Sequence, residues 1–358
     1  MARRSFRPAF GLTLALLGAA LPLSFLAAVC MGTNPLPAGQ VYAVLRDELA
    51  WKVLGRPIPE GWGPGTPIHD VVWLIRLPRL VLAAAVGCCL SLCGAVMQAV
   101  VQNPLADPYV LGISSGASLG ASLALLLGVG AAFGENFVGV MAFLGAMGVS
   151  AAVVLLANAG GRPSTVKLLL AGAALSAVCG AFSNFLIYQA GPDRAASQIV
   201  RWTMGSLAGA SWPVNGVLLA AALGGTAFFL TQCRPLNLML LGEDTALTLG
   251  VSLRRRRMVY LAAASLLVGL SVWAAGIIGF VGLVIPHLVR LAFGSDHRRL
   301  IPLSALGGAL FLLWADVLCR VILPGNELPV GILTAMLGAP VFLGLMARSR
   351  YGFGGPNP

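Results

Sequence analysis

Residues 103–120 read NPLADPYVLGISSGASLG, and this stretch decides the fold because a polar turn in it ends one apolar run and opens another. The new run carries Gly112, Gly116 and Gly120, a small residue at every fourth position. In a membrane helix this spacing lines one face with bare backbone, so that a neighbouring helix can pack very close. The stretch therefore predicts a multi-helix membrane protein with a structured loop between two spans.

The composition of the whole chain agrees with this prediction. Of its 358 residues, 58% are hydrophobic and only 10% are charged, whereas a soluble domain carries about 25% charged residues. A soluble fold of this composition would expose large apolar patches. A membrane β-barrel is disfavoured because the apolar runs are continuous rather than alternating. We expect an all-α, polytopic membrane protein.

Ten apolar runs of about 20 residues are candidate membrane spans. The first follows Arg3, Arg4 and Arg7 and is longer than the core of a cleaved signal peptide, about 7–15 residues, so we expect it to be retained. The eighth is short and interrupted by Pro286, which requires protein or water around it. The ten runs lie near residues 9–31, 80–101, 109–128, 137–157, 166–189, 212–232, 258–277, 281–294, 301–322 and 330–347.

The basic residues indicate the orientation of these spans. If the chain starts inside, 15 of its 23 basic residues fall on inner segments, which predicts that both termini are cytoplasmic. The net charge of +11 then comes from basic residues that cluster at the ends of the spans, and it does not indicate nucleic-acid binding. We expect one domain, 1–358, with an outer loop at 32–75 that holds a short helix near 40–54. We also expect a cytoplasmic connection at 233–257 and a short outer helix over Ser197 to Leu207.

No nucleotide site is visible in the chain. A phosphate-binding loop needs Gly-x-x-x-x-Gly-Lys followed by Ser or Thr, but the two Lys residues precede Val53 and Leu168. The seven Cys residues lie mostly inside apolar runs and form no Cys-x-x-Cys pair, which favours buried thiols over a metal site. Any ATP hydrolysis must therefore occur on another polypeptide.

The inner connection contains LGEDTALTLG at 241–250, which predicts a short amphipathic helix. Glu243 and Asp244 lie near its start, where negative charge complements the helix dipole, and Gly250 is a plausible end. One interpretation is an ordinary loop helix, with Arg254 to Arg257 anchored on lipid phosphates. The other is a docking helix for a soluble partner. The residues alone leave both open.

A few charged and polar residues near the spans are candidate functional residues. Asp316 and Arg320 are one helical turn apart and are expected to pair, which leaves Arg320 partly available to the outer surface. Arg76 and Arg79 either anchor a helix end or form positive posts for an acidic partner. His287 is either a packed residue or part of a proton site. Three further residues, on the short outer helix, face a substrate path or the membrane interface: Trp202, Met204 and Ser206.

Several sequence blocks resemble the permease subunits of type II ABC importers for iron chelates and cobalamin, the FecCD/BtuC-like family. The resemblance runs from about residue 70 to 347. Its strongest blocks are Arg76–Arg79, Gly94–Gln98, Asn103–Gly120, Leu241–Val251, Gly279–His287, Glu327–Gly331 and Gly338–Pro340.

The resemblance implies a homodimer of ten-span subunits with the pathway along the two-fold axis. Two ATPase subunits would dock below, and a substrate-binding protein would dock above on Arg76, Arg79 and Arg320. The family's coupling helix matches Gly242, Glu243, Asp244, Leu247 and Gly250. The candidate path and packing residues are Gly112, Ser115, Gly116, Gly120, Trp202, Met204 and Ser206.

The expected function is import of an iron chelate, a ferric siderophore or haem, across the bacterial cytoplasmic (inner) membrane. Cobalamin is the alternative cargo within the family. An ion-coupled secondary transporter is a different class, but it requires intramembrane acidic groups, and Asp316 alone lies deep. The chain is not expected to be an enzyme or to bind a cofactor or a metal, because ATP and Mg²⁺ would be held by the partner subunits.

Overall fold

The computed structural model describes residues 9–32, 34–56, 58–59, 63–159, 165–190, 195–248, 253–323 and 325–348, which form helices and no strand. Three shorter apolar helices are α5 (Ile113–Leu127), α13 (Val281–Phe293) and α15 (Val330–Arg348). In the described residues, seven helices are long and apolar enough to cross a membrane: α1 (Phe10–Cys30), the helix from Pro67 to Val100, α6 (Phe137–Asn158), α7 (Thr165–Ala190), α9 (Trp212–Thr231), α12 (Arg254–Ala275) and α14 (His297–Val321).

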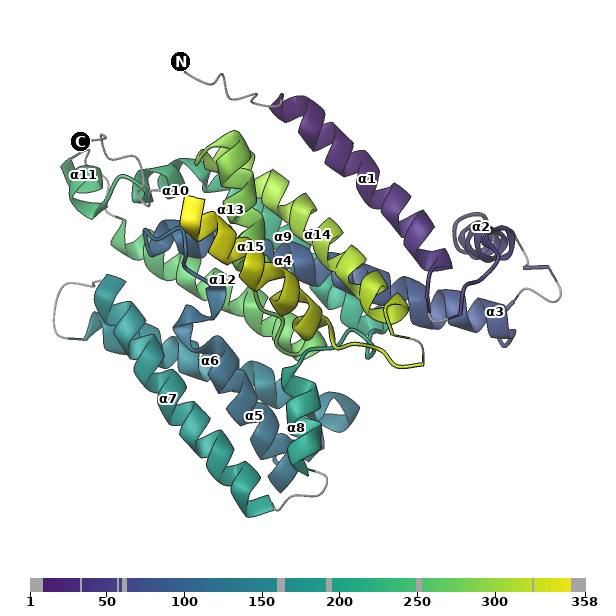
Figure 1. Cartoon of the computed structure of the whole chain (residues 1–358), viewed down its shortest axis with the longest axis horizontal. Coiled ribbons are helices and arrows are strands. Elements are labelled where there is room, and N and C mark those ends of the chain that lie inside the picture. The colour runs from purple at the N-terminus through teal and green to yellow at the C-terminus, as the bar shows by residue number, and fades with distance from the viewer. Residues whose placement is uncertain are drawn as a thin grey trace.

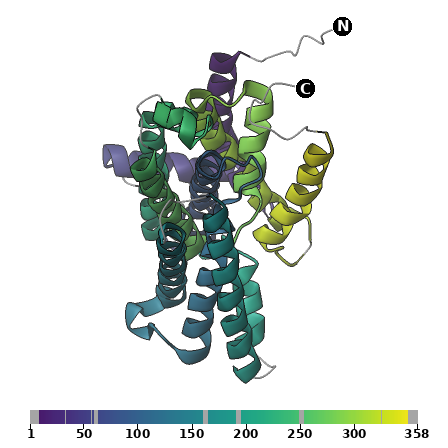
Figure 2. The same cartoon turned by 90° about the vertical axis from the view of Figure 1, so that its left-hand side faces the viewer.

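One group of helices surrounds a buried central helix, α4 (Leu77–Val100), which continues the helix that begins at Pro67 (Figure 1). Helices α9, α12, α13 and α14 pack around α4, while α5, α6 and α7 form the second group, which α12 joins through α6. Helix α15 lies at the margin, where it contacts α13 and α14 (Figure 2). The prediction of an all-α membrane protein is confirmed.

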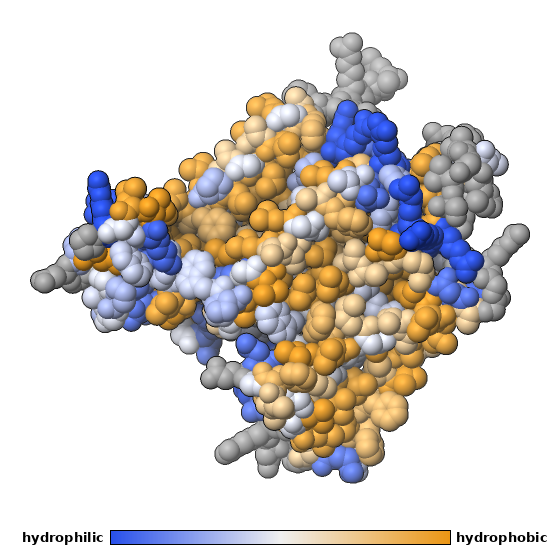
Figure 3. All heavy atoms as spheres, turned by 180° about the vertical axis from the view of Figure 1, so that it is seen from behind, coloured by the Kyte–Doolittle hydropathy of each residue, from blue (hydrophilic) through white to orange (hydrophobic). Residues whose placement is uncertain are grey.

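The two ends of the molecule are polar and its middle is apolar. Short helices α10 (Cys233–Met239) and α11 (Glu243–Thr248) lie at the end shared by the start of α1 and the end of α15 (Figure 1). Helices α2 (Ala38–Leu54) and α3 (Pro67–His69) lie at the opposite end. Hydrophobic residues cover most of the middle, and hydrophilic residues gather at these two ends (Figure 3). This distribution is typical of a protein that spans a bilayer.

The glycine stripe of α5 packs against α6, as the spacing predicts. A Cβ atom added to Gly116 would lie 2.4 Å from the Gly145 carbonyl oxygen, and one added to Gly120 would lie 2.1 Å from that of Met141. Gly112 has a φ of 72° and separates the 3-10 helix η2 (Pro108–Leu111) from α5. Backbone contact between α5 and α6 is therefore possible only because these positions lack side chains.

The predicted start of the second span, near residue 80, is wrong because the helix begins at Pro67. It passes through α3 and a π-helical segment, η1 (Asp70–Arg76), into α4. Pro78 has no N–H to offer to the preceding turn. In π-helical geometry that N–H would bond to the Trp73 carbonyl, which instead accepts a hydrogen bond from Trp212 Nε1 at 3.0 Å. The tryptophan thus replaces the missing donor.

Two other boundaries differ from the sequence prediction. Helix α13 continues through Pro286 instead of breaking there. The Gly282 carbonyl, which loses its helical donor at Pro286, lies against Gly94, where an added Cβ would be 1.7 Å away. The short outer helix, α8 (Ala195–Thr203), ends before the predicted Leu207, and Gly205 follows it with a φ of 72°. Helix α2 confirms the predicted helix near 40–54. A 3-10 helix, η3 (Ala131–Asn136), precedes α6.

Candidate functional site

A buried ion cluster lies near the outer-loop ends of α4 and α14. Arg79 Nε donates to Asp316 Oδ1 at 2.8 Å, and Arg320 Nε lies 3.1 Å from Asp316 Oδ2. Arg79 Nη1 also donates to Glu327 Oε2 at 2.7 Å. The Asp316 side chain is fully buried, whereas that of Glu327 is 44% exposed. The predicted pairing of Asp316 with Arg320 is confirmed, and Arg79 is a second partner that the sequence did not reveal.

Arg76 closes the end of α1. Its Nη1 donates to the carbonyls of Val29 and Cys30 at 2.9 and 3.0 Å, and its Nη2 donates to that of Asn34. The last carbonyls of a helix lack partners within the helix, and a cation there complements the dipole. Arg76 is 6% exposed, so in the isolated chain it acts as a helix cap.

Arg320 is also buried, at 4% exposed. The expectation that it is partly available to the outer surface is therefore wrong for the isolated chain, because Asp316 and the Met31 carbonyl draw its guanidinium inward. Its Nη2 has no hydrogen-bond partner. Arg76, Arg79 and Arg320 line one outer groove of 330 Å³ together with Glu327. With Asp316 included, three arginines face two carboxylates, so this outer cluster carries a surplus positive charge.

The connection at 233–257 contains the predicted short helix. Helix α11 covers Glu243–Thr248, and Gly242 precedes it with a φ of 95°, a conformation that glycine adopts without strain. Gly250 and the side chains of Glu243, Asp244 and Leu247 lie outside the described residues, so their coupling role stays a prediction. Ala246 is fully buried, which fixes one face of α11 against the protein.

The turn after α8 joins three parts of the chain. Ser206 N donates to the Ala275 carbonyl at 2.8 Å, at the end of α12, and Gly331 N donates to the Met204 carbonyl at 3.1 Å, at the start of α15. Trp202 is half-buried at the end of α8, and Ser115 is half-buried on α5. The structure therefore places Trp202, Met204 and Ser206 at a junction of helices, and their role in a path stays a prediction.

The break between α12 and α13 is closed by a tyrosine. Tyr109 donates its hydroxyl to the Ile278 carbonyl at 3.2 Å and accepts from Ile278 N at 3.3 Å. One hydroxyl therefore satisfies both backbone groups of Ile278, a residue that no helix includes.

His287 on α13 is 6% exposed and packs inside the protein.

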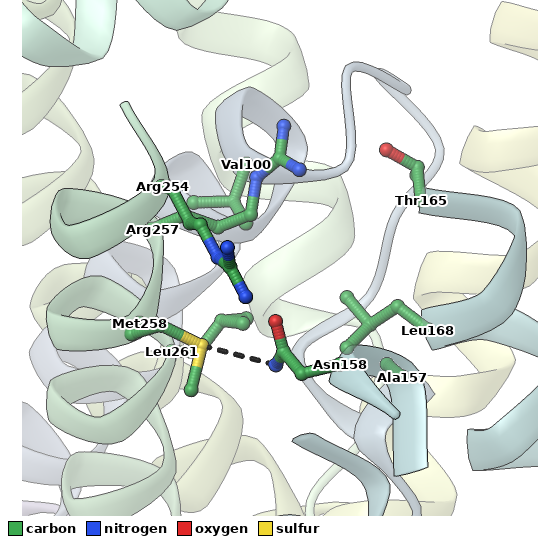
Figure 4. Close-up of a pocket in the computed structure, with 9 residues that line it drawn as sticks. All are labelled: Val100, Ala157, Asn158, Thr165, Leu168, Arg254, Arg257, Met258 and Leu261. Atoms are coloured by element: carbon green, nitrogen blue, oxygen red, sulfur yellow. Dashed lines mark hydrogen bonds between the residues drawn. The ribbon is translucent and has the colours of Figure 1, made fainter. Parts of the chain in front are cut away.

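A small pocket lies between α4, α6, α7 and α12 (Figure 4). Arg254 and Arg257 border it from α12, and Asn158 Nδ2 on α6 donates to Met258 Sδ at 3.3 Å. Its volume of 20 Å³ is far below the roughly 300–1,000 Å³ of small-molecule sites. This pocket cannot hold a metal chelate. In the described part of the chain, no group of three or more His, Cys, Asp or Glu residues is placed to bind a metal ion.

Comparison with known proteins shows a single family. The model of the FecCD transport family matches residues 20–348. A haemin transport permease, HmuU of Yersinia pestis, is 43% identical and covers 80% of this chain and 86% of its own length. A vitamin B12 import permease, BtuC of Klebsiella pneumoniae, is 40% identical over 97% of this chain and 96% of its own. A solved structure described as an inward-facing conformation of a metal-chelate type ABC transporter has a TM-score of 0.79 at 29% identity, over 94% of this chain and 99% of the other.

Proposed function

The chain belongs to the FecCD transport family, and we propose that it is the membrane subunit of an ABC importer that moves an iron chelate, a ferric siderophore or haem, into the cell. The observation that carries this proposal is the 43% identity to a haemin permease over 80% of the chain. Ten spans, cytoplasmic termini and residence in the bacterial inner membrane are parts of the same proposal.

The two polar ends suit partners on opposite sides of the membrane. Helix α11 lies at the same end of the molecule as the start of α1 and the end of α15 (Figure 1), where an ATPase subunit would dock on it through Glu243 and Leu247. At the other end, the outer cluster has one more positive than negative charge, which suits an acidic surface on a substrate-binding protein. We infer that Arg79 and Arg320 exchange their present partners for carboxylates of that protein.

We place the passage for the chelate between two copies of the chain. The small pocket between α4, α6, α7 and α12 holds only 20 Å³, and a larger hollow of 670 Å³ lies along α2 at one end of the molecule. Neither is a route through the chain for a chelate that needs several hundred Å³. A path lined by two copies avoids the need for such a cavity within one. ATP and Mg²⁺ would bind only to the partner ATPases, which would drive the passage open and closed.

Cobalamin is the second candidate cargo, because the vitamin B12 permease of Klebsiella pneumoniae aligns with 97% of this chain. The test reconstitutes the chain with its ATPase and binding-protein partners in proteoliposomes that hold ATP and Mg²⁺. We expect uptake of haemin, of a ferric siderophore or of cyanocobalamin that needs ATP and survives a protonophore. Uptake that needs an ion gradient and no ATP would contradict the proposal.

A further inference from the structure

Asn237, on α10, fastens this short helix to the start of α14. Its Nδ2 donates to Asp296 Oδ1 at 2.7 Å, and its Oδ1 accepts from His297 N at 2.9 Å. His297 Nδ1 lies 2.7 Å from the same amide oxygen, so this ring nitrogen donates. Only one orientation of the amide fits, because the flipped amide would set a donor against His297 N and an acceptor against Asp296. The contact is therefore specific for asparagine.

Asp296 is the N-cap of α14 and also accepts from Arg298 N at 3.1 Å. Partial burial acts to raise the pKa of Asp296, but the hydrogen bonds from Asn237 and Arg298 N outweigh it and hold that pKa below its usual range. The carboxylate is thus charged at neutral pH. A second carboxylate at position 237 would be repelled by it.

Gln102, just past the end of α4, holds the last residue of α10, two positions after Asn237. Its Nε2 donates to the Met239 carbonyl at 2.7 Å, across 137 residues of sequence. The same carbonyl accepts from Gly242 N, at 3.3 Å, in the turn that leads to α11. Gln102 has a φ of 56°, which is uncommon for a residue other than glycine. Gln102 adopts this conformation just past the end of α4, where its side chain bonds to α10, the helix that precedes α11.

Helices α4 and α14 connect these contacts to the far end of the molecule. They cross in backbone contact, since a Cβ atom on Gly308 would lie 2.3 Å from the Gly87 carbonyl oxygen. At their other ends they carry Arg79 and Asp316, the core of the outer cluster. Because the two helices are rigid and packed against each other, a displacement at one end of the pair reaches the other end.

We propose that Asn237 and Gln102 are positioning residues that carry the movement of α11 to α14 and α4, and so to the outer cluster. This inference rests on the proposed function, because it assumes an ATPase that moves α11. The last three residues of α10 (Cys233–Met239) bond to both helices, Asn237 to the start of α14 and the Met239 carbonyl to Gln102 just past α4, and α11 follows directly. A displacement of α11 therefore moves both together.

The first test uses Asn237→Asp and the exchange variant Asn237→Asp with Asp296→Asn. The single variant sets two carboxylates against each other. The exchange variant removes this repulsion. In the unaltered protein Asp296 Oδ1 alone accepts from both Asn237 Nδ2 and Arg298 N, so the amide introduced at position 296 turns to donate to the carboxylate at position 237 through its nitrogen and to cap α14 through its oxygen, a position that asparagine favours. In the reconstituted complex with partner subunits, we expect the single variant to move about tenfold less cargo per ATP hydrolysed, the scale set by one hydrogen bond to a charged group. The exchange variant should recover most of that loss.

The second test uses Gln102→Asn, whose side chain tolerates the same φ but is one methylene too short to reach Met239. Gln189→Asn is the matched control, since it makes the same change at an exposed position on α7, which does not contact α10. We expect Gln102→Asn to lower cargo moved per ATP by a similar factor, with ATP hydrolysis retained. The control should leave that ratio unchanged.

A third readout needs no partner. Hydrogen exchange of residues 236–248 in the purified chain should be about tenfold faster in Asn237→Asp and Gln102→Asn, and restored in the exchange variant. Unchanged exchange, or unchanged cargo per ATP in both variants, would overturn the proposal. A parallel fall of uptake and ATP hydrolysis, without rescue, would also overturn it, since it indicates a merely structural role. If the unaltered complex fails to import with ATP, the proposed function is wrong. The hydrogen-exchange measurement on the purified chain still tests whether Asn237 and Gln102 hold α10 in place.

Discussion

Gly120→Ala is expected to destabilise the protein through one methyl group. The added Cβ would lie 2.1 Å from the Met141 carbonyl oxygen, and real Cβ atoms essentially never approach closer than 3.0 Å. Helices α5 and α6 must therefore separate by at least 0.9 Å at this point. The obstacle is helix backbone, which cannot rotate away as a side chain can. Overpacking of this kind costs about 1–3 kcal/mol.

The control is Gly18→Ala on α1, where an added Cβ meets no atom within 4 Å. Alanine is favoured over glycine in a helix by roughly 0.5–1 kcal/mol, so this change should be neutral or stabilising. The two variants thus differ in sign. Thermal unfolding of the purified chain in one detergent, followed by circular dichroism, measures both. Equal midpoints for Gly120→Ala and the unaltered protein would refute the close approach of α5 and α6.

Three further changes test other parts of the structure. Asp316→Asn leaves the buried Arg320 without a carboxylate partner and Arg79 with Glu327 alone, and should cost about 3–5 kcal/mol; an unaltered unfolding midpoint would exclude the buried cluster. Arg76→Glu together with Arg79→Glu should weaken docking of the binding protein, most at low salt because screening is weaker there; co-purification that is insensitive to these changes argues against docking at this site. Glu243→Lys should leave ATP hydrolysis while lowering uptake, and normal uptake would remove the coupling role from α11.

Hydropathy predicted the helices well, because membrane spans must be continuous and apolar. It failed where a side chain from far along the chain replaces a backbone donor. The second span was expected to begin near residue 80, whereas the helix begins at Pro67 and passes through Pro78. Trp212, which supplies the missing hydrogen bond, is remote in sequence and gives no local signal. Helix α13 also continues through Pro286, at a point where Gly94 on another helix lies against the Gly282 carbonyl.

The outer cluster shows the same limit. The pairing of Asp316 with Arg320 follows from their spacing of four residues, and the structure confirms it. The contact of Arg79 with Asp316 joins residues 237 positions apart, and no periodicity in the sequence encodes it. The burial of Arg320 follows from this contact network, so its exposure could not be judged from its place near a span end.

The bond pair between Tyr109 and Ile278 has a consequence for the passage of water and ions. A gap between two helices inside a bilayer normally draws in water, because its bare amide groups need partners. Here the phenol serves both groups of Ile278, so at this residue no solvent molecule is required to bridge the gap. This pair of hydrogen bonds thus removes one point at which water, and ions with it, could enter between the two helices.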